Sequence, residues 1–103
     1  MGVRENKVEK LLDEQFKKLG GLTRKWVSPG RDGVPDRICI LDGHVWFVEV
    51  KTIDGKLSKV QEREIERLKD VGAQVHIVYG AVDVHCFIEG VVKPTLRGQN
   101  DIT

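Results

Sequence analysis

Residues 37–51, which read RICILDGHVWFVEVK, predict a β-hairpin that decides how the rest of the chain folds. Two runs rich in isoleucine, valine and aromatic residues, 37–41 and 44–51, flank the pair Asp42-Gly43. This pair is favoured in two-residue type I′ turns, because both turn positions take a positive φ that aspartate and glycine tolerate. We therefore expect two antiparallel strands joined by a tight turn at Asp42 and Gly43.

The position of the turn sets the register of the hairpin, because each step back along one strand is matched by a step forward along the other. Ile38 then pairs with Phe47, and two steps further on Asp36 lies opposite Glu49. Directly opposed side chains have Cβ atoms roughly 4.5–5.5 Å apart, where two like charges are destabilising unless a cation lies between them. Lys51 follows Glu49 by two residues and projects from the same face. The sequence therefore predicts two carboxylates and one ammonium on one side of the hairpin end.

Two carboxylates and an ammonium are the groups that metal-assisted phosphodiester hydrolysis requires. Hard oxygen ligands bind Mg²⁺ or Mn²⁺ and leave positions for water, and the metal stabilises charge on the phosphate. A nearby ammonium can act on the attacking water or on the developing charge. Alternatively, Asp36 serves the preceding turn, and Glu49 and Lys51 form an ordinary surface pair. We favour the functional interpretation when the three residues are taken together in register. The neighbouring Val48 and Val50 require burial, which sets the opposite face of the strand into the core.

Further helices and strands are expected around the hairpin, from the spacing of apolar residues and turn formers. The predicted segments are a helix at 5–19, a short strand that 22–27 could hold, a helix at 59–71, a strand at 74–79, a segment at 82–88 that suits either a short helix or a strand, and a loose tail from Pro94 onward. A helix between two strands makes a βαβ crossover, which sets those strands parallel. The predicted fold class is α/β, a mixed sheet flanked by helices in the order α-β-β-β-α-β.

Length and composition indicate one domain spanning residues 1–103, with a core at about 4–90 and a tail at 91–103. The chain carries 17 basic and 16 acidic residues, so any nucleic-acid surface must be a local patch. No apolar run approaches the roughly 18 residues that span a bilayer, and the first ten residues lack the apolar segment of a signal peptide. We therefore expect a cytoplasmic protein with no membrane partner.

The cysteines and histidines do not form a recognisable metal-binding pattern. Cys39 and Cys86 show no CxxC spacing and are interpreted as reduced, buried side chains. The three histidines lie apart among apolar residues, so a zinc site has no support.

Several motifs follow one another in order along residues 4–80. They are Glu5, Gly20-Gly21, Lys25-Trp26-Val27-Ser28-Pro29-Gly30, Gly33-Val34-Pro35-Asp36-Arg37, Glu49-Val50-Lys51 and Gln61. The pair PD and ExK alone is a weak pattern, but the ordered set resembles the VRR-NUC family, the virus-type replication–repair nucleases of the PD-(D/E)xK superfamily. Longer members of the family carry extra domains that select the substrate. The 103 residues show no such domain, so the resemblance is to the stand-alone, phage-type members.

The resemblance implies a restriction-endonuclease-like core, a divalent cofactor, Mg²⁺ or Mn²⁺, and cleavage of DNA phosphodiester bonds. It also implies a preference for branched DNA, such as Holliday junctions or flaps, and the compact homodimers that the stand-alone viral members form. We therefore expect a metal-dependent, structure-selective DNA endonuclease. The alternatives are a DNA-binding module of the same fold that does not cleave, and a nuclease subunit that needs a partner protein for substrate choice.

The resemblance assigns metal binding and catalysis to the end of the hairpin. Asp36 and Glu49 match metal ligands of the family, and the main-chain carbonyl of Val50 matches a further ligand. Lys51 matches the catalytic lysine, which acts on the water or on the phosphate charge.

Two other residues, Glu5 and Gln61, allow both a structural and a functional interpretation. Helical geometry turns Glu5 toward the sheet and Glu9 toward the solvated flank, but the helix dipole also favours an acidic residue in the first turn. Ser58-x-x-Gln61 is a capping box, yet Gln61 shares a helix face with Ile65 that points toward the sheet. The resemblance favours a catalytic role for both residues, with Glu5 also a metal ligand.

The candidate DNA-binding residues are Lys25, Ser28, Arg31 and Arg37. Arginine and lysine make many of the phosphate contacts in protein–DNA complexes. Ser28 lies in the turn-forming run before Asp36, where the backbone could approach DNA closely. Each of the cations could equally be an ordinary exposed charge.

Overall fold

The computed structural model describes the chain from residue 2 to residue 102, with side chains from 5 to 98. The elements in chain order are α1 (Gly2–Lys18), β1 (Leu22–Lys25), β2 (Arg37–Leu41), β3 (His44–Lys51), α2 (Lys59–Asp70), β4 (Val75–Tyr79), α3 (Gly80–Phe87), the π-helix η1 (Ile88–Val92) and α4 (Lys93–Ile102). Within this span, no helix has both the length and the apolar character needed to cross a membrane.

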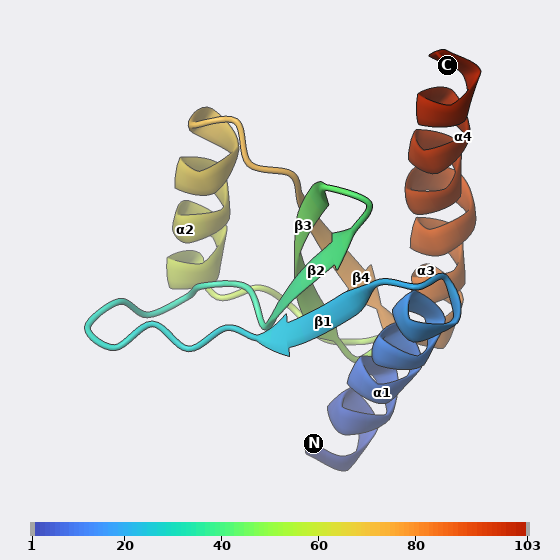
Figure 1. The fold of residues 1–103 in the computed structure, drawn as a ribbon. Helices are drawn as coiled ribbons and strands as arrows, with labels where there is room; N and C mark the ends of the chain where they lie inside the picture. Colours follow the sequence, from blue (N-terminus) through green and yellow to red (C-terminus); the bar gives the residue numbers. More distant parts are fainter. Residues whose placement is uncertain (1, 103) are drawn as a thin grey trace.

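The strands form one mixed sheet in the order β1-β2-β3-β4. Strands β1, β2 and β3 pair antiparallel, whereas β4 pairs parallel to β3. Helix α2 connects β3 to β4, and Figure 1 shows it on one side of the sheet, with α1, α3 and α4 on the other. The predicted α/β class is therefore confirmed, including the parallel pair that the crossover helix requires.

The hairpin between β2 and β3 forms as predicted. Asp42 and Gly43 have φ angles of 55° and 82°, so both turn positions lie in the left-handed region that a type I′ turn requires. The strands pair in the predicted register, with Ile38 opposite Phe47. Because side chains alternate between the two faces of a strand, this register decides which residues of β3 enter the core.

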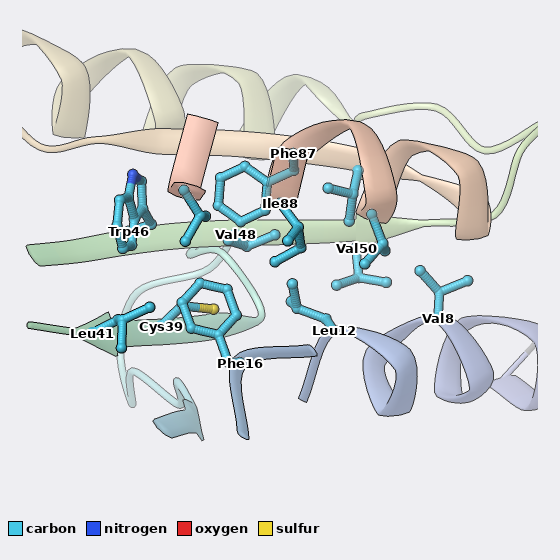
Figure 2. Packing of buried hydrophobic residues seen from close by; sticks show 13 residues of the cluster. Val8, Leu12, Phe16, Cys39, Leu41, Trp46, Val48, Val50, Phe87 and Ile88 are labelled. Atoms are coloured by element: carbon cyan, nitrogen blue, oxygen red, sulfur yellow. The ribbon is translucent and has the colours of Figure 1, made fainter. Parts of the chain in front are cut away.

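The main core lies between the sheet and the helices α1 and α3. Trp46, Val48 and Val50 project from alternate positions of β3 and are buried. Figure 2 shows Phe16 of α1 and Phe87 of α3 lying beside these strand residues. The Phe16 and Trp46 rings meet edge to face with centroids 6.0 Å apart, a favoured aromatic geometry. The apolar face of β3 is therefore the platform on which α1 and α3 pack.

The expectation of a loose tail after residue 90 is wrong. The chain remains helical from residue 80 to residue 102, and the segment predicted to be ambiguous is the helix α3. Val92 is fully buried, and Leu96 packs against the core. Pro94 does not break the helix, because it follows the π-helical turn and is the second residue of α4. In the π-helical turn the N–H of Lys93 donates to the carbonyl of Ile88, so Pro94 follows a point where the regular i→i−4 bonding is already interrupted.

The two cysteines differ in exposure, which corrects the expectation that both are buried. Cys39 is buried, and burial raises the pKa of its thiol to about 12. Cys86 is exposed, because α3 turns Val84 and Phe87 toward the core instead.

The long connection between β1 and β2 is held against α2 by a close backbone contact. Gly33 has a φ of +84°, and a Cβ atom there would lie 2.8 Å from the carbonyl oxygen of Val60 in the first turn of α2. Gly30 has a similar φ of +81°, but a Cβ atom there would meet nothing within 4 Å. The two glycines therefore differ in what surrounds them and share the same backbone constraint.

This pair of glycines predicts different costs for the same substitution. We expect Gly33→Ala to lower the free energy of unfolding by about 2–4 kcal/mol, through both the left-handed backbone and the clash with Val60. Gly30→Ala, the matched control, should cost only about 1–2 kcal/mol from the backbone alone. Urea denaturation of the two variants measures the difference, and equal losses would show that the contact with α2 does not matter.

Candidate active site

Asp36 lies one position beyond the last paired residues of the hairpin, Arg37 and Val48. Its Oδ2 atom accepts a hydrogen bond from the backbone N–H of Val50 at 2.9 Å. Its backbone carbonyl accepts a hydrogen bond from the N–H of Trp26, also at 2.9 Å. Bonds from two different segments thus orient the Asp36 carboxylate toward β3.

Glu49 is the most deeply buried acidic side chain among the described residues, with 2% of the side chain exposed. Its Oε2 atom accepts a hydrogen bond from Nε2 of Gln61 at 3.0 Å and lies 3.5 Å from Nζ of Lys51. Its Oε1 atom is buried without a hydrogen-bond partner in this structure. One carboxylate oxygen is therefore held by Gln61 and Lys51, while the other is buried and unpaired.

The electrostatic environment of Glu49 favours its neutral form. Burial raises the pKa of Glu49 to about 7, and the nearby negative charge of Asp36 acts in the same direction. Lys51 lowers this pKa but does not offset the other two effects. Two carboxylates with a single ammonium leave the site short of positive charge.

The oxygen atoms of this site suit a hard divalent cation. Asp36, Glu49 and the main-chain carbonyl of Val50 could supply the ligands, and Mg²⁺ is commonly bound through one or two carboxylates with several waters. Across the described side chains, no group of three or more carboxylate, histidine or cysteine residues converges on a metal-sized site. The buried, unpaired Oε1 atom of Glu49 nevertheless fits such a cation, which would stabilise the charged form that burial disfavours.

Gln61 combines the two roles that the sequence left as alternatives. Its Oε1 atom accepts the backbone N–H of Ser58 at 2.9 Å, and its own backbone N–H donates to Oγ of Ser58 at 3.1 Å, which completes the capping box of α2. The Nε2 atom of the same side chain donates to Glu49. An amide carries both a donor and an acceptor, so one residue can cap the helix and hold the carboxylate together.

Helix α1 brings two acidic side chains near the site, not one. Glu5 lines a surface hollow together with Lys51, and its negative charge contributes to the raised pKa of Glu49. Glu9 was expected on the solvated flank, which is wrong. Its side chain is 15% exposed and lies 3.2 Å from Nε of Arg37.

Arg37, which the sequence predicts as a phosphate contact, is paired in the structure with two carboxylates of α1. Its guanidinium forms ion pairs with Glu9 and, at 2.9 Å, with Asp13, and the side chain is 18% exposed. The hydroxyl of Thr23 donates to the same Asp13 at 2.6 Å. This network ties α1 to β1 and β2 beside Asp36. Strand alternation carried the missing signal, because Arg37 points to the face opposite Asp36, where α1 packs.

The other candidate DNA-binding residues follow the connection between β1 and β2. Lys25 is exposed at the end of β1, and Ser28 is half-buried in the turn that follows. The carbonyl of Ser28 accepts the N–H of Arg31 at 3.1 Å, and the Arg31 side chain is 57% exposed. Lys25 pairs with Arg37 next to Asp36, whereas Ser28 and Arg31 follow further along the connection.

Comparisons with known proteins relate this chain to nucleases. No protein-family model matches the sequence. The chain is 42% identical over 90 residues to protein p44 of Acyrthosiphon pisum secondary endosymbiont phage 1, a protein named as a nuclease, and the match covers 86% of this chain and 96% of the relative. A solved structure described as a VRR_NUC domain superimposes with a TM-score of 0.81 at 42% identity, covering 85% of this chain and 97% of that structure. This chain therefore belongs to the VRR-NUC family of nucleases.

Proposed function

We propose that the protein is a metal-dependent DNA endonuclease that hydrolyses phosphodiester bonds, with a preference for branched DNA. The observation that carries the proposal is the buried carboxylate of Glu49, held by Lys51 and Gln61 beside Asp36, with one oxygen unpaired. A buried carboxylate in surroundings that disfavour its charge is costly to maintain. Such a group is best explained by a cation that it binds during function.

In this proposal Asp36, Glu49 and the carbonyl of Val50 hold Mg²⁺ or Mn²⁺. When bound, the metal supplies positive charge to the phosphate and acidifies a water molecule. The hydrogen bond from Val50 fixes one oxygen of Asp36, which leaves its other oxygen to bind. Gln61 acts as a positioning residue, because it holds one oxygen of Glu49 and leaves the second unpaired and available to the cation.

Lys51 is the proposed catalytic cation. Its ammonium lies 3.5 Å from Glu49, and its side chain is 15% exposed, so it is held in place and still faces solvent on one side. An ammonium in this position donates a hydrogen bond that orients the attacking water or stabilises the charge on the phosphate oxygens. Glu5, which lines the same hollow as Lys51, adds a further carboxylate for the cation or the water.

We further propose that the protein acts as a homodimer on DNA in the cytoplasm of a bacterial or phage-infected cell. Three apolar residues in register, Leu22, Ile40 and Val45, lie side by side on β1, β2 and β3. They are 43%, 36% and 38% exposed, on the face of the sheet opposite the core. A contiguous apolar row supports an interface between two copies, which would bring two active sites to a branched substrate.

Cleavage should require both the metal and the hairpin residues. We expect wild-type protein to cut labelled duplex, flap or four-way-junction DNA with Mg²⁺ or Mn²⁺, and not after chelation. Asp36→Ala and Lys51→Ala should each reduce the rate by about 100-fold or more, because each removes a group that acts on the reacting phosphate. A gel assay measures this, and metal-independent cutting or full activity of both variants would refute the proposal.

Metal binding can be checked without DNA by thermal unfolding. Mn²⁺ at ten times its dissociation constant should stabilise the wild type by about 1.4 kcal/mol, which raises the melting temperature by roughly 5–10 °C. Asp36→Ala should show little or no such shift, because a ligand is lost.

The double role of Gln61 predicts that stability and activity separate in two variants. Ser58→Ala removes one capping bond and should cost about 1 kcal/mol of stability, with cleavage unchanged. Gln61→Ala should lose stability to a similar extent and also lower kcat several-fold, because Glu49 loses its donor. Parallel denaturation and rate measurements test this, and equal activity of the two variants would argue against a positioning role.

The dimer predicts a specific effect at the apolar row. Val45→Lys should convert the protein to a monomer in sedimentation, because the charge would be buried in the interface. Val71→Lys, at an 83% exposed position at the end of α2, is the control and should leave the dimer intact. A wild-type protein that sediments as a monomer at micromolar concentration would overturn this part of the proposal.

A further inference from the structure

A second polar hollow, of about 260 Å³, lies between α2 and the tip of the connection that joins β1 to β2. Figure 1 shows this connection projecting past the N-terminal end of α2. The residues that line the hollow are Gly30, Arg31, Asp32, Val60, Arg63 and Arg67. Three arginines from two separate segments therefore line one hollow, together with one carboxylate, Asp32.

The convergence follows from local geometry. Val60, Arg63 and Arg67 have helical spacings of three and four residues, so they form one stripe along α2. On the facing side, the N–H of Arg31 donates to the carbonyl of Ser28 across a turn in which Gly30 has a φ of +81°. This φ suits the third residue of a type II turn. The close contact between Gly33 and Val60 then holds the turn against the stripe.

A buried carboxylate holds two of the arginines in place. Oε1 of Glu64 lies 3.1 Å from Nη1 of Arg67 and 3.9 Å from Nη1 of Arg31, and the Glu64 side chain is only 11% exposed. The two arginine side chains remain 57% and 59% exposed. A guanidinium has five donors, so the groups that meet Glu64 still present N–H donors toward the hollow.

We infer that this hollow binds a backbone phosphate of the DNA strand, a few nucleotides from the bond that is cut; the inference rests on the proposed function. Gln61, which touches Glu49, lies two and six residues before Arg63 and Arg67, so the hollow adjoins the same helix on another of its sides. A helix is about 10 Å across, so the hollow lies within the span of a few nucleotides from Glu49. Planar, bidentate guanidiniums suit phosphate oxygens better than any other side chain.

Surface ion pairing alone is the competing explanation. An exposed arginine–carboxylate pair typically contributes little to stability, and it does not require a third arginine or a turn docked on the helix. The arrangement favours a phosphate site over a simple ion pair, because the turn places Arg31 beside the stripe of α2 that carries Arg63 and Arg67.

The test measures DNA affinity in the absence of metal, so that no cleavage occurs, at a series of salt concentrations. Arg67→Ala should weaken binding by about ten-fold and reduce the slope of log K against log salt by about 0.9, the value for one lost phosphate contact. Arg63→Ala should have the same direction of effect. Arg97→Ala on α4 removes one exposed arginine elsewhere and should leave both quantities nearly unchanged.

A second measurement uses DNA in which one phosphate at a time is replaced by an uncharged methylphosphonate. Wild type should lose affinity at one position near the cleavage site, and Arg67→Ala should lose less affinity there than the wild type does. Cleavage by the wild type with unchanged affinity and slope for Arg67→Ala and Arg63→Ala would overturn the phosphate site and leave the nuclease proposal standing. A wild type that neither binds nor cleaves DNA would overturn both.

Discussion

The register of the β2–β3 hairpin is the constraint on which the core and the site both depend. The tight turn at Asp42 and Gly43 allows only one pairing, with Ile38 opposite Phe47. A slip by one residue would exchange the two faces of β3, so that Glu49 would enter the core and the apolar residues beside it would enter the site. Packing of α1 and α3 on one face of the strand and the chemistry on the other are therefore two results of the same turn.

Helix α2 joins the site to the fold through its first turn. The side chain of Gln61 completes the cap of the helix and reaches Glu49, while the backbone of Val60 meets Gly33 of the preceding connection. The same helix end thus positions both a residue of β3 and the segment that leads to Asp36. The folding of the first turn of α2 is therefore linked to the position of the Glu49 carboxylate, because Gln61 contributes to both.

The features that short-range rules decide could be predicted from the sequence, and those that tertiary packing decides could not. The turn, the hairpin register and the parallel crossover follow from local residue preferences and chain connectivity. The place of Arg37 depends on which helix covers its face of β2, and the helix from residue 93 depends on a core that a short apolar pattern does not reveal. The role of Gln61 could not be decided from the sequence, because a capping residue and a site residue are both compatible with the same motif. The structure shows that one side chain makes both contacts.

The buried, unpaired oxygen of Glu49 has a consequence for which substitutions this position accepts during evolution. Burial and the neighbouring negative charge of Asp36 mean that the ionised form of Glu49 destabilises the folded state. A substitution that removes the charge but keeps the size and a hydrogen-bond acceptor for Gln61, such as glutamine, therefore costs folding little. Selection for activity keeps the acid itself in place, so a relative that has lost its role in the cell should exchange it for glutamine early and remain well folded.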